Sequence, residues 1–257
     1  MSTDKSGPQS LTLRQQLGFE ADPNKLEHTV SSSGAPVTKM ESSQPGFPVY
    51  HRRIANPVPL TFICIGAFFI LYGALLTEVR GLRNWQIILN IGLPLCGPGL
   101  MAASMFSFAE GSTFLATFAG SLSGILSGYS LTFLPWTGIA ATYIETAQMM
   151  NEPISAGLDQ LQQAQGMLFL IAMIPIFVLL VGSVRTSIPI SATTLFMVLA
   201  FILQGANLLQ GGEKAIQYAA GAFFWIAGII CWYISLSVLL QEEKIGILPV
   251  FPLPRVA

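Results

Sequence analysis

Long stretches without any charged or histidine side chain dominate the sequence after residue 53. Six such runs, 24 to 34 residues long, cover residues 54–77, 84–109, 111–144, 160–184, 186–212 and 215–241. A helix needs about 20 apolar residues to cross ~30 Å of hydrocarbon, and the runs lack the alternation typical of membrane barrel strands. The pattern predicts an all-α polytopic membrane protein. Its six transmembrane helices are expected near 58–77, 86–107, 112–134, 167–184, 189–209 and 217–240.

The residues outside these runs divide the chain into three parts. Residues 1–53 hold eleven charges of mixed sign with scattered Ser, Gly and Pro, and such a segment cannot bury enough apolar surface to fold. We therefore expect a disordered, polar, cytoplasmic N-terminal tail at 1–53. The six-helix transmembrane domain follows at 54–241, and a short C-terminal tail at 242–257.

The composition agrees with a membrane protein and argues against a nucleic-acid binder. Only 10% of the 257 residues are charged and 52% are apolar, whereas about 25% of an ordinary soluble domain is charged. Lys and Arg number 12 against 13 Asp and Glu, so the basic excess of a nucleic-acid-binding protein is missing. Membrane lipid is an expected partner of this chain, and nucleic acid is not.

Basic residues near the helix ends set the expected orientation, because they concentrate on the cytoplasmic side. With a cytoplasmic N-terminus, five lie inside and three outside. The inner set is Arg52, Arg53, Arg185, Lys244 and Arg255, and the outer set is Arg80, Arg83 and Lys214. The expected loop 135–165 has three acidic residues and no basic one, which fits the outside. Both termini are therefore expected in the cytoplasm.

Groups that could catalyse a reaction within the membrane are missing from the expected spans. His28 and His51 both precede the first span, and the sequence has no HExxH motif and no Gly-rich phosphate loop with Lys. A nucleophile would have no buried base, and the three cysteines are expected to pack as small side chains. We expect no enzyme, catalytic residue, cofactor or metal. A path lined by hydroxyls, amides and apolar groups suits a small monoanion or its neutral acid.

Small residues recur at every fourth position of the third expected span. They are Ser112, Ala116, Gly120, Gly124 and Gly128. Such a stripe allows close helix contact, either within the chain or between subunits. The same span carries hydroxyl side chains that either face a conduit or bond to carbonyls of their own helix. They are Thr113, Thr117, Ser121, Ser123 and Ser127.

Prolines mark the second and first spans. Pro94 and Pro98 obstruct regular helix in the second span, which predicts either a packing kink or irregular backbone lining a cavity. The first span opens with Asn56-Pro57-Val58-Pro59-Leu60. Asn56 suits the helix N-cap and Pro57 the first helical position. This end either simply starts the helix or attracts a carboxylate.

The opening of the first span resembles the NPxPLG element of the acetate uptake transporter family of fungi and bacteria. Three more motifs match in order: FAEGSTF at 108–114 resembles FAEGNTF, LPWTGI at 134–139 resembles IPWFGI, and FPLP at 251–254 resembles the closing motif of fungal members. Over residues 50–257 the chain is therefore similar to a divergent, fungal-type member of that family.

The resemblance implies a function and a set of site residues. It implies six-helix subunits, assembled as a homo-hexamer with a pore in each, that move acetate and related short carboxylates across the plasma membrane. It places a hydrophobic constriction at Ile65, Leu122 and Met197, and a residue that influences substrate choice at Cys231. The motif residues at the pore entrance are then Asn56, Pro57, Pro59, Leu60, Glu110, Ser112 and Thr113.

The chain departs from the family pattern near the constriction. Thr61 replaces Gly, Ser112 replaces Asn, Leu122 replaces Tyr, and Ile125 and Leu126 replace a Phe-Trp pair. Loss of an aromatic hydroxyl and an amide makes the neck drier, so a bulkier or more apolar acid is as suitable as acetate. We predict a facilitative transporter or channel for a small carboxylate. The alternative is a non-conducting membrane sensor or scaffold that signals through the N-terminal tail.

Overall fold

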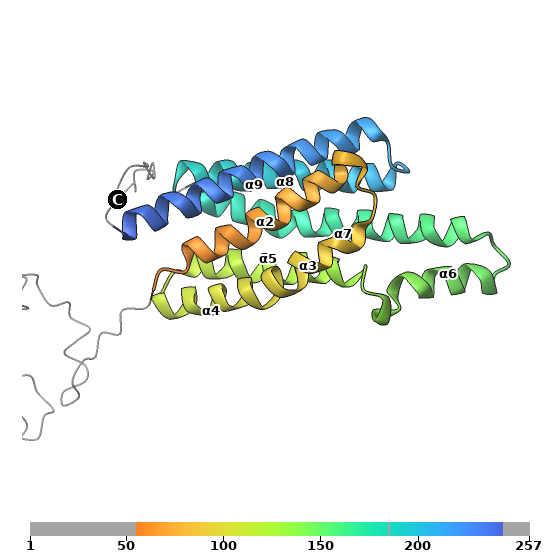
Figure 1. Ribbon diagram of the computed structural model, residues 1–257, viewed down its shortest axis with the longest axis horizontal. Helices are drawn as coiled ribbons and strands as arrows, with labels where there is room; N and C mark the ends of the chain where they lie inside the picture. The colour runs from red at the N-terminus through yellow and green to blue at the C-terminus, as the bar shows by residue number, and fades with distance from the viewer. Residues whose placement is uncertain (1–54, 185, 244–257) are drawn as a thin grey trace, which may run out of the picture. The chain divides into compact units, whose positions relative to one another are not determined.

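The computed structural model describes residues 55–184 and 186–243 as a bundle of helices (Figure 1). Six helical segments are long and apolar enough to span a membrane, as the sequence predicts: Val58–Leu76 (α2), Trp85–Glu110, Thr113–Leu131 (α5), Ile154–Ser183 (α7), Ile188–Leu209 (α8) and Lys214–Glu242 (α9). Successive spans alternate in direction, so α2, α5 and α8 run parallel to one another. The expected tail at 1–53 and most of the expected tail at 242–257 lie outside the described residues.

The second span is built from several helical pieces, as its two prolines predict. Short helices at Trp85–Ile88 and Leu89–Ile91 (α3) lead into a π-helical segment, Gly92–Gly99, which is followed by α4, Leu100–Glu110. The wide turn is filled by neighbouring hydroxyls: Ser123 Oγ donates to the Gly97 carbonyl oxygen at 2.8 Å, and the Ser130 side chain occupies the space beside Gly92. The irregular backbone therefore packs against α5, which favours the kink over a cavity-lining role.

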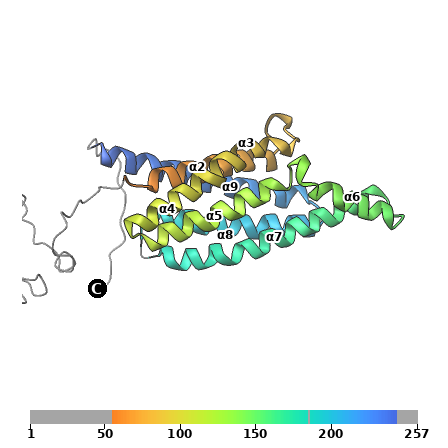
Figure 2. The same cartoon turned by 90° about the horizontal axis from the view of Figure 1, so that it is seen from below.

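The expected loop 135–165 is wrong in part, because most of it is helical. The segment forms a 3-10 turn at Pro135–Thr137, the helix α6 at Ile139–Met149 and the first turns of α7. Its Ala, Gln, Met and Leu residues favour helix. The segment as a whole, with its acidic and amide side chains, is too polar for a membrane span. The 30 residues of α7 extend ~45 Å, more than the ~30 Å of hydrocarbon. Its start and α6 accordingly form a hairpin that projects past the other helix ends in both views (Figure 2).

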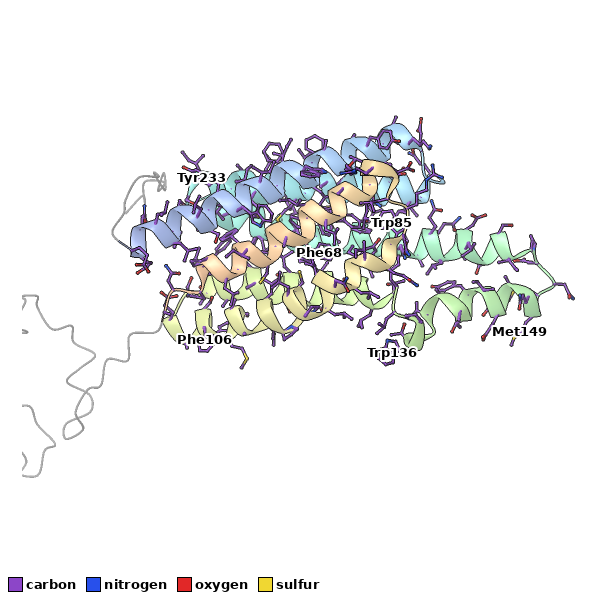
Figure 3. All side chains as sticks on the ribbon, viewed as in Figure 1. Phe68, Trp85, Phe106, Trp136, Met149 and Tyr233 are labelled. Atoms are coloured by element: carbon purple, nitrogen blue, oxygen red, sulfur yellow. The ribbon has the colours of Figure 1, made fainter. Side chains whose placement is uncertain are left out.

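The hairpin is held by close backbone contact and carries exposed apolar side chains. A Cβ at Gly157 of α7 would lie 2.6 Å from the Tyr143 carbonyl oxygen of α6, so only glycine permits this approach. Trp136 and Met149 are 86% and 83% exposed, and both point outward at this end (Figure 3). The described hairpin continues α7 directly and so lengthens the bundle at this end.

Paired glycines bring the helices of the bundle together. A Cβ at Gly73 of α2 would lie 2.9 Å from the Gly221 carbonyl oxygen of α9, and one at Gly221 would lie 3.2 Å from that of Gly73. Gly166 of α7 and Gly205 of α8 face one another in the same way, at 3.2 and 3.3 Å. Lipid gives little hydrophobic drive for helix association, so such close van der Waals contact stabilises the bundle instead.

The small-residue stripe of α5 contributes less to packing within the chain. Ala116 is buried and Gly120 meets Ser104 of α4, whose Oγ donates to the Ala116 carbonyl oxygen at 2.7 Å. A Cβ added at Gly124 or Gly128 would meet no neighbouring helix within 4 Å. The second half of the stripe is therefore open within the described part of the chain. Intramolecular packing explains only its first half.

Candidate functional site

The first span begins at one end of the bundle, and its motif residues build that end. Asn56 Oδ1 accepts the Val58 backbone N–H at 3.0 Å, and its Nδ2 donates to Glu242 Oε1 of α9 at 3.3 Å. The helix begins one residue later than expected, because Pro57 takes the N-cap position and Asn56 precedes it. Pro57 and Pro59 are buried, whereas Leu60 is exposed. The Ser235 hydroxyl of α9 donates to the Pro59 carbonyl oxygen at 3.0 Å, which fixes the start of α2 on α9.

The second motif forms the connection between α4 and α5 at the same end of the bundle (Figure 1). Glu110 ends α4, Gly111 adopts φ +86° and Ser112 precedes α5. The left-handed backbone at Gly111 favours glycine, because a Cβ is strained there. Glu110 and Thr113 are exposed and Ser112 is half-buried. The expected entrance residues of the two motifs therefore share one end of the bundle.

The expected constriction residues all lie in the interior of the bundle. Ile65, Leu122 and Met197 are fully buried and belong to one continuous apolar core. They sit on α2, α5 and α8, which run parallel. Cys231 of α9 is also fully buried in this core. We call Ile65, Leu122 and Met197 the aliphatic layer.

A second layer lies two helical turns farther along the same three helices. Tyr72, Tyr129 and Gln204 each follow a member of the aliphatic layer by seven residues, which is ~10 Å along a helix and the same helix face. The Tyr72 and Tyr129 hydroxyl oxygens are 3.3 Å apart, in a buried hydrogen bond. The amide of Gln204 lies beside the Tyr72 hydroxyl. We call these three residues the polar layer.

Aromatic rings enclose the two tyrosines. Tyr72 packs edge-on against Phe224 of α9, with ring centroids 4.9 Å apart, and stacks on Phe169 of α7 at 5.9 Å. Tyr129 meets Phe169 edge-on at 5.0 Å. A small apolar cavity, with room for about one water molecule, adjoins both tyrosines. Its wall is made by Phe68, Tyr72, Ile125, Leu126, Tyr129, Leu168, Phe169, Phe201 and Phe224, and the position of Phe68 within the bundle is visible in Figure 3.

Two amide side chains of α8 are buried with an oxygen that has no hydrogen-bond partner among the described residues. They are Gln204 and Asn207, each 2% exposed, through Oε1 and Oδ1. An unpaired amide oxygen deep in a membrane protein costs folding free energy, so these two oxygens are candidates for hydrogen bonds from a ligand or water. The sequence interpretation missed both amides and both tyrosines. The sequence does contain a signal for three of them: Tyr72, Tyr129 and Gln204 each lie seven residues after a member of the aliphatic layer.

The hydroxyl residues of α5 play a smaller part than the conduit alternative requires. Thr117 and Ser121 donate to carbonyls one turn earlier in α5, at 2.8 and 2.7 Å, and Ser127 does the same. Ser123 donates to Gly97 of the π-helical segment. Bonding to backbone therefore accounts for these four hydroxyls.

Charged side chains among the described residues lie near the ends of the spans or in the hairpin. An ion pair joins Arg83 and Glu78 at 3.8 Å in the exposed connection after α2. Within residues 55–184 and 186–243, no group of three His, Cys, Asp or Glu side chains is placed to hold a metal ion. The interior of this part of the chain thus offers neutral hydrogen-bonding groups and apolar walls.

Comparison with known proteins places the fold in a family. The sequence model of the GPR1/FUN34/yaaH family matches residues 40–255, which is most of the chain. The chain belongs to the GPR1/FUN34/yaaH family. This agrees with the resemblance carried by the motifs at 56–60 and 108–114, and the six apolar helices support an integral membrane protein.

Individual relatives agree with this membership. Acetate permease A of Emericella nidulans is 23% identical over 219 residues, which cover 82% of this chain and 71% of the permease. The structure of the bacterial acetate channel SatP superimposes with a TM-score of 0.59 at 18% identity, covering 77% of this chain and 99% of the channel. The second likeness shows a shared fold.

Proposed function

We propose that this GPR1/FUN34/yaaH family member is a facilitative transporter or channel, and not an enzyme, that moves acetate or another small monocarboxylic acid across a membrane. The observation that carries the proposal is the neutral interior of the described bundle. A multivalent substrate would find no opposite charge at depth, whereas a monoanion or its neutral acid needs only hydroxyl and amide partners. The names of the permease and channel relatives support acetate as one substrate.

We infer that the path runs inside each subunit, through the aliphatic layer. Ile65, Leu122 and Met197 would close it to ions, because a hydrophobic constriction excludes water when narrow. Cys231 would then tune the size of the acid that passes. Full burial of all four side chains supports the inference, since residues on a path face the protein interior and not lipid.

The residues at the start of α2 and α5 would form the entrance to this path. Asn56, Pro57, Pro59 and Leu60 shape the start of α2. On the neighbouring connection, Glu110, Ser112 and Thr113 lie at the same end. The free N–H groups at the starts of α2 and α5 would donate hydrogen bonds to a carboxyl group that arrives from solution.

Flux in proteoliposomes tests this function. The purified full chain, reconstituted into vesicles, should conduct labelled acetate and propionate above empty vesicles at neutral pH, where the acid's own permeation is slowest. A wild-type chain with no flux of any short carboxylic acid would refute the transporter. If the same chain then proves to support a cellular phenotype that requires residues 1–50, the sensor or scaffold replaces it.

We also propose a homo-hexamer in the plasma membrane, with both termini in the cytoplasm. The exposed half of the α5 stripe, at Gly124 and Gly128, supports a contact between subunits, because its backbone is open to close approach. Gly124→Leu should shift the purified particle to a smaller mass, while the control Leu199→Ala, at a partly exposed position of α8, should not. Equal masses for both variants would remove the α5 stripe from the subunit contact.

A further inference from the structure

We propose that Tyr72, Tyr129 and Gln204 bind the carboxyl group of a protonated short-chain monocarboxylic acid, whose apolar chain lies among the surrounding aromatic rings. The proposal rests on the proposed function, since it names where the conducted acid is recognised. It goes further by assigning the residues that bind the acid and the protonation state in which the acid binds. The site lies one layer beyond the aliphatic constriction, toward the end of the bundle that carries the hairpin.

The hydrogen-bonding groups of the polar layer complement a neutral acid. A bonded pair of hydroxyls uses only one of its two protons, so the Tyr72–Tyr129 pair keeps one O–H free to donate. The pair itself is long at 3.3 Å, against a usual 2.7–2.8 Å, and opens at little cost. Gln204 Oε1 is a buried acceptor that receives no hydrogen bond from residues 55–184 or 186–243. A carboxylic acid supplies the matching acceptor and donor on one group.

A carboxylate matches the same groups less well. Its two oxygens only accept hydrogen bonds, so the Gln204 oxygen would remain unpaired beside a negative charge. The cavity wall and Gln204 include no Asp, Glu, Lys, Arg or His, so these described residues supply no cation to offset that charge. The polar layer favours the protonated form on both grounds.

The surrounding rings select for the rest of the molecule. Phe169, Phe201 and Phe224 line the cavity together with Phe68 and Leu168, so an alkyl chain gains by burial there. A second carboxyl group, as in a dicarboxylic acid, would meet apolar atoms only and lose its hydration. The described state has room for about one water molecule. The rings must therefore turn aside when the acid enters.

Asn207 extends the polar groups toward the hairpin end. It follows Gln204 by three residues on α8, is equally buried, and also has an unpartnered side-chain oxygen among the described residues. Positions three apart lie on adjacent turns of the same face. A carboxyl group that leaves Gln204 thus finds a second acceptor one turn nearer that end.

Equilibrium binding of labelled propionate to the purified full chain tests the site. Tyr129→Phe keeps the ring and removes the hydroxyl, and Gln204→Leu keeps the volume and removes the amide. Each should raise the apparent Kd about fivefold, the loss expected for one hydrogen bond. The exposed control Tyr218→Phe should bind as the wild type does. Each methylene from acetate to butyrate should tighten binding roughly threefold to fourfold, and succinate should bind weakly.

The pH dependence gives an independent readout. Above the pKa of the acid, ~4–5, the Kd for total propionate should rise about tenfold per pH unit, because only the protonated form binds. A Kd unchanged between pH 5 and 7 would overturn the neutral-acid assignment. Thermal unfolding of each variant accompanies the binding curves.

The outcomes separate this site from the proposed function. A wild-type chain that neither binds nor conducts any short acid defeats both. A chain that conducts, but whose Tyr129→Phe and Gln204→Leu variants bind like the wild type, keeps the function and loses this site. Variants that unfold at lower temperature with unchanged Kd would show that the polar layer only stabilises the fold, which also overturns the proposal. Succinate binding as tight as propionate binding would do the same.

Discussion

Replacing Gly73 with alanine should separate two helices that the bundle needs in contact. A Cβ at this position would lie 2.7 Å from Trp225 Cδ1 and 2.9 Å from the Gly221 carbonyl oxygen. The indole ring can move, but the backbone oxygen cannot unless α9 shifts as a whole. Overpacking of this kind costs about 1–3 kcal/mol. By the scaling for domains of similar size, the unfolding temperature should fall on the order of 2–10 °C.

The matched control is Gly124→Ala on α5, where the new Cβ would meet no neighbouring helix within 4 Å. It removes the low helix propensity of glycine and should be neutral or stabilising by about 0.5–1 kcal/mol. Both variants are unfolded thermally in a detergent in which light scattering reports monomers, so that contacts between subunits do not enter. Equal stability of Gly73→Ala and wild type, or an equal loss in Gly124→Ala, would refute the close packing of α2 on α9.

Four other changes give separate expectations. Leu122→Ala should admit bulkier acids, because it widens the aliphatic layer, and Leu122→Tyr should restore a preference for acetate. If competition uptake gives the same substrate preference for both variants and the wild type, Leu122 does not line the path. Glu110→Gln should leave the pH dependence of flux unchanged, because this exposed carboxylate only stabilises the N-terminus of α5, by up to about 1 kcal/mol. A shifted pH dependence would give Glu110 a role in transport. Deletion of residues 1–50 should preserve flux in vesicles, and its loss would favour the sensor. Gln217→Leu removes the hydrogen bond from Nε2 to the Leu76 carbonyl oxygen at 2.8 Å and should lower the free energy of unfolding by about 1 kcal/mol. The control Gln163→Leu, at an exposed position, should not. Equal unfolding temperatures of the two variants would show that this hydrogen bond does not stabilise the end of α2.

The six spans were predictable because burial in lipid demands long uncharged runs. The expected starts at 58 and 189 agree with α2 and α8 to within one residue, and Pro57 and Pro189 mark those starts chemically. The prolines at 94 and 98 also indicated irregular helix correctly, although they could not specify a π-helical segment. Such local signals depend on nearby residues alone, which is why the sequence carries them.

Features that depend on partners far apart in the chain were harder to foresee. The helix α6 and the start of α7 were interpreted as a loop, because polarity ruled out a span and no local signal indicated that two polar helices would pair. The polar layer could not be predicted without knowing that α2, α5 and α8 run parallel. Only then do the residues seven positions after Ile65, Leu122 and Met197 lie near one another. The constriction at Ile65, Leu122 and Met197 came from resemblance, and its role in transport stays a prediction.

Blocking the interior with one large side chain tests the central claim, a path through the core of each subunit. Leu122→Trp fills the aliphatic layer, and Leu199→Trp places the same ring on a partly exposed position of α8. With both variants folded and reconstituted at equal density, initial propionate flux should fall to the empty-vesicle level for Leu122→Trp and remain at the wild-type level for Leu199→Trp. Undiminished flux through Leu122→Trp would contradict the path.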